Sequence, residues 1–276
     1  MSVAAVLARN EFLKTRKRRA FWVGLGLLAL IATLGFGEDF LDARREGDGS
    51  FALPGAWSEI LGEPTQVPLI FGAVVLILLA ASEFSWRTGR QNVIDGLTRG
   101  QWYWGKTFAV VLTALAFVGM YISIGGTLAL MSTDLGSGDG IVRAGQLQAI
   151  GAVVLSYAGY ASLALLVATT VRSTGGAMAI WFFYVAFGET LLRGGIGKLW
   201  EGARPYLTYL PIASFDQLRN YLMFDPDRLA VVTAARLEAG RAAPTVGDAS
   251  MLALVAAAWA TAFVVIGFLA FRRRDI

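Results

Sequence analysis

The chain has 276 residues, of which 56% are hydrophobic and only 16% are charged, and its formal net charge is +4. Because a soluble domain has about a quarter of its residues charged, this composition and a mean hydropathy of +0.58 favour a membrane protein. The chain contains no Cys and no His, which excludes thiol catalysis, a Ser-His-Asp triad and the usual nitrogen- or sulfur-ligated zinc site.

The N-terminal residues predict a short helix that lies in the membrane interface. Over residues 3–14, apolar Val3, Val6, Leu7, Phe12 and Leu13 alternate with charged Arg9, Glu11 and Lys14. Such a pattern is typical of an interfacial amphipathic helix. A cleavable signal peptide is the alternative, because a basic stretch precedes an apolar run. No small-residue cleavage site lies near residues 35–38, so we expect an uncleaved protein.

Six apolar runs are candidates for membrane-spanning helices. They cover residues 20–36, 67–82, 107–131, 147–170, 176–192 and 249–271, and a bilayer requires about 17–25 residues of helix. The predicted fold is an all-α polytopic membrane protein with a single transmembrane domain over residues 1–276. We expect no charged residue in the core of any span. Ion-driven transporters use such groups, so energy for uphill transport is expected to come from elsewhere.

Basic residues predict the orientation. They precede the first span, occur between the second and third spans, include Arg172 between the fourth and fifth, and end the chain at 272–274. The loop after the first span is acidic. By the positive-inside rule, residues 1–19, the 83–106 loop and both termini are expected in the cytoplasm. The helical 193–248 loop is expected outside a multi-pass plasma or inner membrane.

Residues 100–107 contain a literal Walker A string, formed by Gly100 and Gly105-Lys106-Thr107. A P-loop requires a core strand before it and a soluble domain that supplies a second carboxylate, and the sequence predicts neither. We therefore expect no ATPase site and no bound cofactor in this chain. The expected role of four residues is an anchor at the membrane interface: Trp102, Tyr103, Trp104 and Lys106.

The stretch just before the string predicts a short helix. Val93, Ile94 and Leu97 form a small apolar face among polar residues. One interpretation is a solvated loop helix that packs on the end of the bundle. The other is an element that docks in a groove of a soluble partner.

The 83–106 segment resembles the loop between the second and third spans of ATP-binding-cassette type-2 exporter permeases. The residues that carry the resemblance are Glu83-Phe84, Arg87-Thr88, Arg90-Gln91-Asn92, Ile94-Asp95-Gly96-Leu97-Thr98-Arg99, an aromatic pair and Gly105-Lys106. Arg9-Asn10-Glu11-Phe12, Lys14 and Arg18 resemble the interfacial helix of that family. With six spans and cytoplasmic termini, the resemblance covers nearly the whole chain.

The resemblance implies a partner and a set of contact residues. Two permease chains would pair, as a homo- or heterodimer, with two copies of an ATPase subunit that binds ATP and Mg²⁺. A coupling helix over residues 89–98 would contact the ATPase. The implied contact residues are Arg87, Arg90, Val93, Ile94, Asp95, Leu97, Thr98 and Arg99, with Glu83 and Lys106 at the segment ends. The turn at 171–175, with Arg172 and Ser173, would be a second contact.

The resemblance also implies half-spanning outer helices before the last span, which we expect within Glu189–Tyr209. The outer loop departs from the family pattern by continuing to Asp248 with a polar portion at 228–243.

The predicted function is therefore the membrane subunit of an ATP-driven exporter, acting by substrate movement or by force transmission. One alternative is a secondary transporter or channel, with Ser123, Thr127, Ser156, Tyr157, Tyr160 and Ser162 as its polar pathway. Another is a membrane scaffold or assembly factor that binds a partner through 193–248. An intramembrane enzyme is disfavoured, because the sequence predicts no buried acid pair. Apolar spans suit lipids, amphipathic drugs or apolar peptides as substrates.

Overall fold

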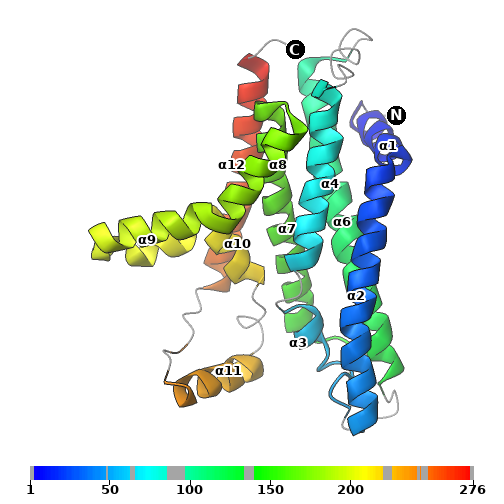
Figure 1. Ribbon diagram of the computed structural model, residues 1–276, viewed down its shortest axis with the longest axis vertical. Coiled ribbons are helices and arrows are strands. Elements are labelled where there is room, and N and C mark those ends of the chain that lie inside the picture. Colours follow the sequence, from blue (N-terminus) through cyan, green and yellow to red (C-terminus); the bar gives the residue numbers. More distant parts are fainter. Residues whose placement is uncertain are drawn as a thin grey trace.

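A computed structural model describes residues 3–47, 49–62, 66–85, 97–133, 140–219, 226–240, 243 and 248–273. Every regular element in these ranges is a helix (Figure 1). Six helices are long and apolar enough to cross a membrane, which confirms the predicted all-helical fold and the number of candidate spans.

The helices follow one another in chain order, and most of them run along one axis (Figure 1). The first is α1 (Val3–Lys17), and α12 (Ala249–Arg273) ends at the same end of the bundle as α1, which we call the terminal end (Figure 1). Between them lie α2 (Arg19–Glu46), α3 (Trp57–Ile60), α4 (Gln66–Ser85), α6 (Arg99–Met131), α7 (Ala144–Val171), α8 (Thr174–Phe183), the π-helical turn η2 (Tyr184–Gly188), α9 (Glu189–Leu199), the 3₁₀ helix η3 (Glu201–Tyr209), α10 (Pro211–Arg219) and α11 (Pro226–Glu238).

Small residues allow close packing around α7, which contacts α4, α6, α10 and α12. Its buried positions include Ala149, Ala161 and Ala168. Gly159 of the same helix faces the Phe215 ring of α10, where a Cβ would lie only 2.3 Å from ring carbons. Lipid tails are as apolar as the helices, so the hydrophobic effect does not draw the helices together within a membrane, and close contacts between small residues and rings hold the bundle together.

The helices α2 and α6 extend well beyond the predicted spans. The first span was expected to end at residue 36, but α2 continues to Glu46 and ends at Gly47, whose φ is 69°. Acidic residues end the apolar run without breaking the helix, which stops where glycine adopts the left-handed conformation. The predicted helix at 3–14 is confirmed as α1, and α6 begins at Arg99, ahead of the predicted start at 107.

The fifth candidate span, Thr174–Leu199, is bent. It runs through α8 and η2, and α9 then turns away and extends sideways from the bundle (Figure 1). The chain thus changes direction near Glu189, at the start of α9 (Figure 1), whereas the predicted boundary of the outer loop is residue 193. The helical content expected before the last span is confirmed as α9, η3, α10 and α11.

Candidate functional site at the terminal end

Oppositely charged side chains from three helices meet inside the terminal end. Lys106 of α6 places its Nζ 2.7 Å from Oε2 of Glu11 on α1 and 2.5 Å from Oε1 of Glu83 on α4. The three residues are only 2%, 7% and 3% exposed. Trp102 donates its Nε1–H to Oε2 of Glu83 at 2.9 Å, and Lys14 lies 3.1 Å from Oε1 of Glu11. We call these five residues the Lys106 cluster.

The charges of the Lys106 cluster cancel, because two carboxylates face two ammonium groups. Burial by itself raises the pKa of Glu11, but the nearby Lys106 and Lys14 outweigh it and hold that pKa below its ordinary value. Ion pairs of this kind are costly to desolvate, and the removal of one partner typically costs about 3–5 kcal/mol because the other charge stays buried. The cluster therefore strongly resists the separation of its helices.

The sequence of α6 explains why the three helices approach so closely. Gly105 has no side chain, and a Cβ there would lie 3.3 Å from Cγ of Glu11, so α1 packs directly on this turn. One turn earlier, Trp102 stacks on Phe271 of α12, with ring centroids 4.8 Å apart. The start of α6 thus connects α1, α4 and α12.

A capping box fixes where α6 begins. The Thr98 hydroxyl accepts a hydrogen bond from the Gln101 backbone N–H, and the Gln101 side chain accepts one from the Thr98 N–H. These bonds satisfy donors that a helix N-terminus leaves unpaired. Lys106 consequently lies at a defined height, opposite the end of α4.

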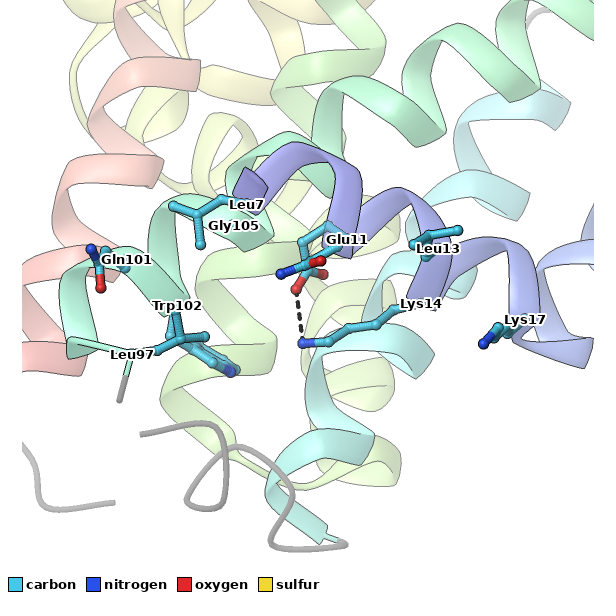
Figure 2. A pocket seen from close by; sticks show the side chains of 10 residues that line it. Leu7, Glu11, Leu13, Lys14, Lys17, Leu97, Gln101, Trp102 and Gly105 are labelled. Atoms are coloured by element: carbon cyan, nitrogen blue, oxygen red, sulfur yellow. Dashed lines mark hydrogen bonds and ion pairs between the residues drawn. The ribbon is translucent and has the colours of Figure 1, made fainter. Parts of the chain in front are cut away.

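A hollow of about 250 Å³ lies between α1 and the start of α6. Figure 2 shows Leu7, Glu11 and Lys14 of α1 on one side and Leu97, Gln101 and Trp102 on the other. The hollow combines apolar walls with basic and amide groups; its remaining lining residues are Asn10, Leu13, Lys17 and Gly105. Such a surface can receive an element that has an apolar face and polar edges.

The structure brings together several residues of the predicted coupling segment. Glu83 and Lys106, expected at the ends of that segment, contact each other directly. Leu97 lines the hollow, Thr98 caps α6, and Arg99 is its first residue. Arg87, Arg90, Val93, Ile94 and Asp95 lie outside the described residues.

The predicted second contact lies beside the end of α4. Arg172, the residue directly after α7, has a positive φ of 57°, and its Cζ lies 5.3 Å from the centroid of the Phe84 ring. Ser173 caps α8 by accepting the N–H of Gly176. Arg172 therefore lies beside Phe84 at the end of α4, whereas the Ser173 hydroxyl is engaged in its own helix.

The prediction of an interfacial anchor was wrong for three of its four residues. Trp102, Tyr103 and Lys106 are at most 2% exposed, and only Trp104, at 49%, faces outward. Tyr103 donates its hydroxyl to the carbonyl of Val264 on α12. These residues lie within α6, and Trp102, Tyr103 and Lys106 point toward α4, α12 and α1, respectively.

The Walker string lies in the first turns of α6. The Gln101 N–H donates to the Thr98 hydroxyl and the Trp102 N–H to the Thr98 carbonyl. A P-loop requires successive N–H groups that are free to surround phosphates. This segment therefore has the geometry of a capped helix.

A comparison with family models assigns the chain to a protein family. The model described as Protein of unknown function (DUF2705) matches residues 28–276. The chain belongs to this family. No curated protein matches it. The region shared with the DUF2705 family contains Glu83, Trp102 and Lys106 of the cluster, whereas Glu11 and Lys14 of α1 precede it.

A second buried polar group lies farther along the bundle in this DUF2705 protein. Glu189, only 3% exposed, accepts hydrogen bonds from the backbone N–H groups of Ile212 at 2.6 Å and Ala213 at 2.9 Å. It also accepts one from the Tyr184 hydroxyl and one from Arg193. A carboxylate thus caps the N-terminus of α10, where the helix dipole favours negative charge.

Asp216 of α10 continues this group toward α7. It accepts the Tyr160 hydroxyl at 2.6 Å and lies 3.6 Å from Arg219. Burial raises the pKa of Asp216 above its ordinary value. Ser156 of α7 donates to the carbonyl of Phe215. We call Tyr160, Tyr184, Glu189, Arg193 and Asp216 the Glu189 cluster.

Buried acids bear on two expectations. The expectation of no buried acid pair is wrong, because Glu11 and Glu83 are both buried and share Lys106. The expectation that the cores of the spans lack charges is not contradicted by Glu189, which is buried within the candidate span Thr174–Leu199. It lies near the end of the predicted fifth span, where an acid normally marks the membrane boundary. Of the proposed polar pathway, Ser123 and Thr127 donate to carbonyls of their own helix, whereas Tyr160 and Ser156 bind α10.

Proposed function

We propose that this chain is the permease subunit of an ATP-driven exporter and that a separate ATPase subunit supplies the energy. The observation that carries the proposal is the Lys106 cluster, which ties α1 to the residues on both sides of segment 86–96. The sequence of that segment and of α1 resembles exporter permeases. In this account, two such chains pair and each docks on one of two ATPase subunits that bind ATP and Mg²⁺.

The buried charges of the Lys106 cluster suit force transmission. A push on segment 86–96 acts on the end of α4 and the start of α6 together, because Glu83 and Lys106 are paired. The ion pair of Glu11 with Lys106 joins α1 to α6, and the stacked rings of Trp102 and Phe271 join the end of α12 to α6. These helix ends would therefore move together. Packed interiors transmit such displacements with little compression.

The orientation in this proposal follows from charge. Arg16, Lys17, Arg19 and the basic end of α12 lie at the terminal end, whereas Glu38 and Asp39 lie along α2 toward the other end. By the positive-inside rule, the terminal end faces the cytoplasm, where a soluble ATPase would reach the hollow beside Leu97.

The test is co-purification of the full chain from its own membrane, with associated proteins identified by mass spectrometry and by ATP hydrolysis. An ATPase subunit should accompany the unmodified chain. Val93→Asp and Leu97→Asp should lose it, because a charge in an apolar docking face opposes binding. Leu237→Asp on α11, where Leu237 is 59% exposed, is the matched control and should retain it. Retention of the ATPase by both docking variants would contradict the proposal.

A secondary transporter is the second candidate, because the buried Glu189 places an ionisable group inside the bundle. Such groups serve as proton relays or ion ligands in transporters. Reconstituted chain without an ATPase distinguishes the candidates. Transport driven by a proton or sodium gradient and lost in Glu189→Gln would favour this alternative, whereas the primary proposal predicts no transport without ATP.

A further inference from the structure

The α9–η3 pair forms an amphipathic arm beside the bundle. Leu192, Ile196 and Leu199 of α9 are 45%, 37% and 90% exposed. With 3.6 residues per turn, their spacing places them on one face of the helix. Trp200 and Tyr206, in the connection and in η3, are 67% and 72% exposed. Because the arm runs across the long axis of the bundle (Figure 1), its direction is that of a helix lying in a membrane surface.

A basic hollow lies on another face of the same arm. It has a volume of about 320 Å³ and is lined by Arg193, Gly194, Gly197, Lys198, Leu207 and Thr208. A Cβ at Gly194 would meet open space, which shows that this side of α9 is uncovered. Both charged groups among these lining residues are cations, so the hollow is complementary to an anion.

We propose that the arm binds an anionic phospholipid of the bilayer, with the lipid phosphate between Arg193 and Lys198. Arginine and lysine are the side chains that recognise phosphate. The acyl chains of the same lipid layer would contact Leu192, Ile196 and Leu199. An amphipathic helix with basic residues on its polar side binds membranes through this combination of buried apolar area and charge.

The proposed site is connected to the Glu189 cluster through Arg193. One guanidinium nitrogen of Arg193 lies 3.3 Å from Oε2 of Glu189, which itself accepts the N–H groups of Ile212 and Ala213. A guanidinium has five N–H donors, so Arg193 can bind a phosphate while it retains its ion pair with Glu189. A bound lipid would therefore stabilise the junction of the arm with α10. This inference concerns the arm alone and does not depend on which partner supplies energy.

The test compares melting temperatures of the full chain in nanodiscs of phosphatidylcholine alone and of phosphatidylcholine mixed with phosphatidylglycerol. The unmodified chain should melt about 2–8 °C higher in the anionic discs. Lys198→Gln should lose at least half of that gain, because the exposed Lys198 has no other role in the site. Arg193→Gln should also lose it, together with some stability in neutral discs. Arg236→Gln, which removes an exposed charge of α11, should keep the full gain.

Three results would overturn the proposal. The first is an equal melting temperature of the unmodified chain in the two kinds of disc. The second is a full anionic gain in Lys198→Gln, which would place the effect at other basic residues. The third is the same gain in neutral discs after addition of soluble glycerol phosphate, which would show that the hollow binds a free phosphate and not a lipid of the bilayer.

Discussion

The Lys106 and Glu189 clusters bury acids by different means, and the difference lies in which parts of the fold each acid joins. At the terminal end, Glu11 of α1 and Glu83 of α4 share the buried Lys106 of α6, and Lys14 of α1 adds a second ammonium group. Glu189 instead accepts two backbone N–H groups of α10. A contact between side chains of separate helices joins bodies that can move together. A carboxylate bound to a helix N-terminus holds one local connection in place.

The largest change in stability is expected when Lys106 is replaced. Lys106→Met should lower the free energy of unfolding by about 3–5 kcal/mol, because two buried carboxylates lose their main partner. Lys14→Met should cost no more than about 1 kcal/mol, since its side chain is 36% exposed. Unfolding by titration with denaturing detergent in mixed micelles measures both. Equal losses would show that the cluster does not depend on its buried cation. Adding Glu11→Gln and Glu83→Gln to Lys106→Met should recover part of the stability.

The second effect concerns the cap of α10. Glu189→Gln should cost about 1–3 kcal/mol, because the charged acceptor of the Ile212 and Ala213 N–H groups is lost. Limited proteolysis should then cut between α9 and α10 sooner than in the unmodified chain. Glu238→Gln on the exposed part of α11 is the matched control and should change neither measurement. Cleavage as slow as in the unmodified chain would remove the anchoring role of this cluster.

Replacing the N-cap residues of α6 and α8 is expected to change the stability by a smaller amount. Thr98→Ala should destabilise the chain by about 1 kcal/mol, because the capping box at the start of α6 is lost. Ser173→Ala should cost less, since the Ser173 hydroxyl lies 3.5 Å from its N–H donor. Melting temperatures of the two variants in one detergent check this order, and the reverse order would indicate that the height of Lys106 is set by other contacts.

The smallest expected effect concerns pH, because the contributions of Glu11 and Asp216 to stability should change in opposite directions as the pH falls. The pKa of Glu11 is below its ordinary value of 4.5, so the stability it contributes is full above that value and is lost as pH falls through the lowered pKa. The pKa of Asp216 is above its ordinary value of 3.8, so its contribution grows as pH falls through the raised pKa. Melting curves between neutral and acid pH should show a smaller acid loss for Glu11→Gln and a larger one for Asp216→Asn. The same pH profile in both variants would contradict the assignment.

The sequence was sufficient for the helices and insufficient for their polar contacts. Apolar runs and basic flanks identify the six candidate spans, because crossing a membrane constrains length and composition. They did not show where α2 ends, because Glu38 and Asp39 change the hydropathy without changing the helix. Gly47 marks that end, and its position after the last helical residue was a usable signal.

The two clusters depend on contacts between distant residues. Glu11 and Lys106 are separated by 95 positions, and no local pattern relates them. Lys106 was expected at the membrane border because a lysine beside aromatic residues is typical there. In the structure α6 begins at Arg99, so Lys106 lies inside the helix, on the side that faces Glu11 and Glu83. The capping box itself, Thr98 followed three residues later by Gln101, was visible in the sequence.

The central claim is that the terminal end docks on an ATPase subunit, and site-directed crosslinking tests it most directly. The chain has no cysteine, so Leu97→Cys provides a single reactive site beside the hollow of the Lys106 cluster, and Leu237→Cys provides one on exposed α11. A thiol-reactive photo-crosslinker should join Leu97→Cys to the ATPase subunit in native membranes and should leave Leu237→Cys without that product. Equal crosslinking at both positions, or none at Leu97→Cys, would contradict the account.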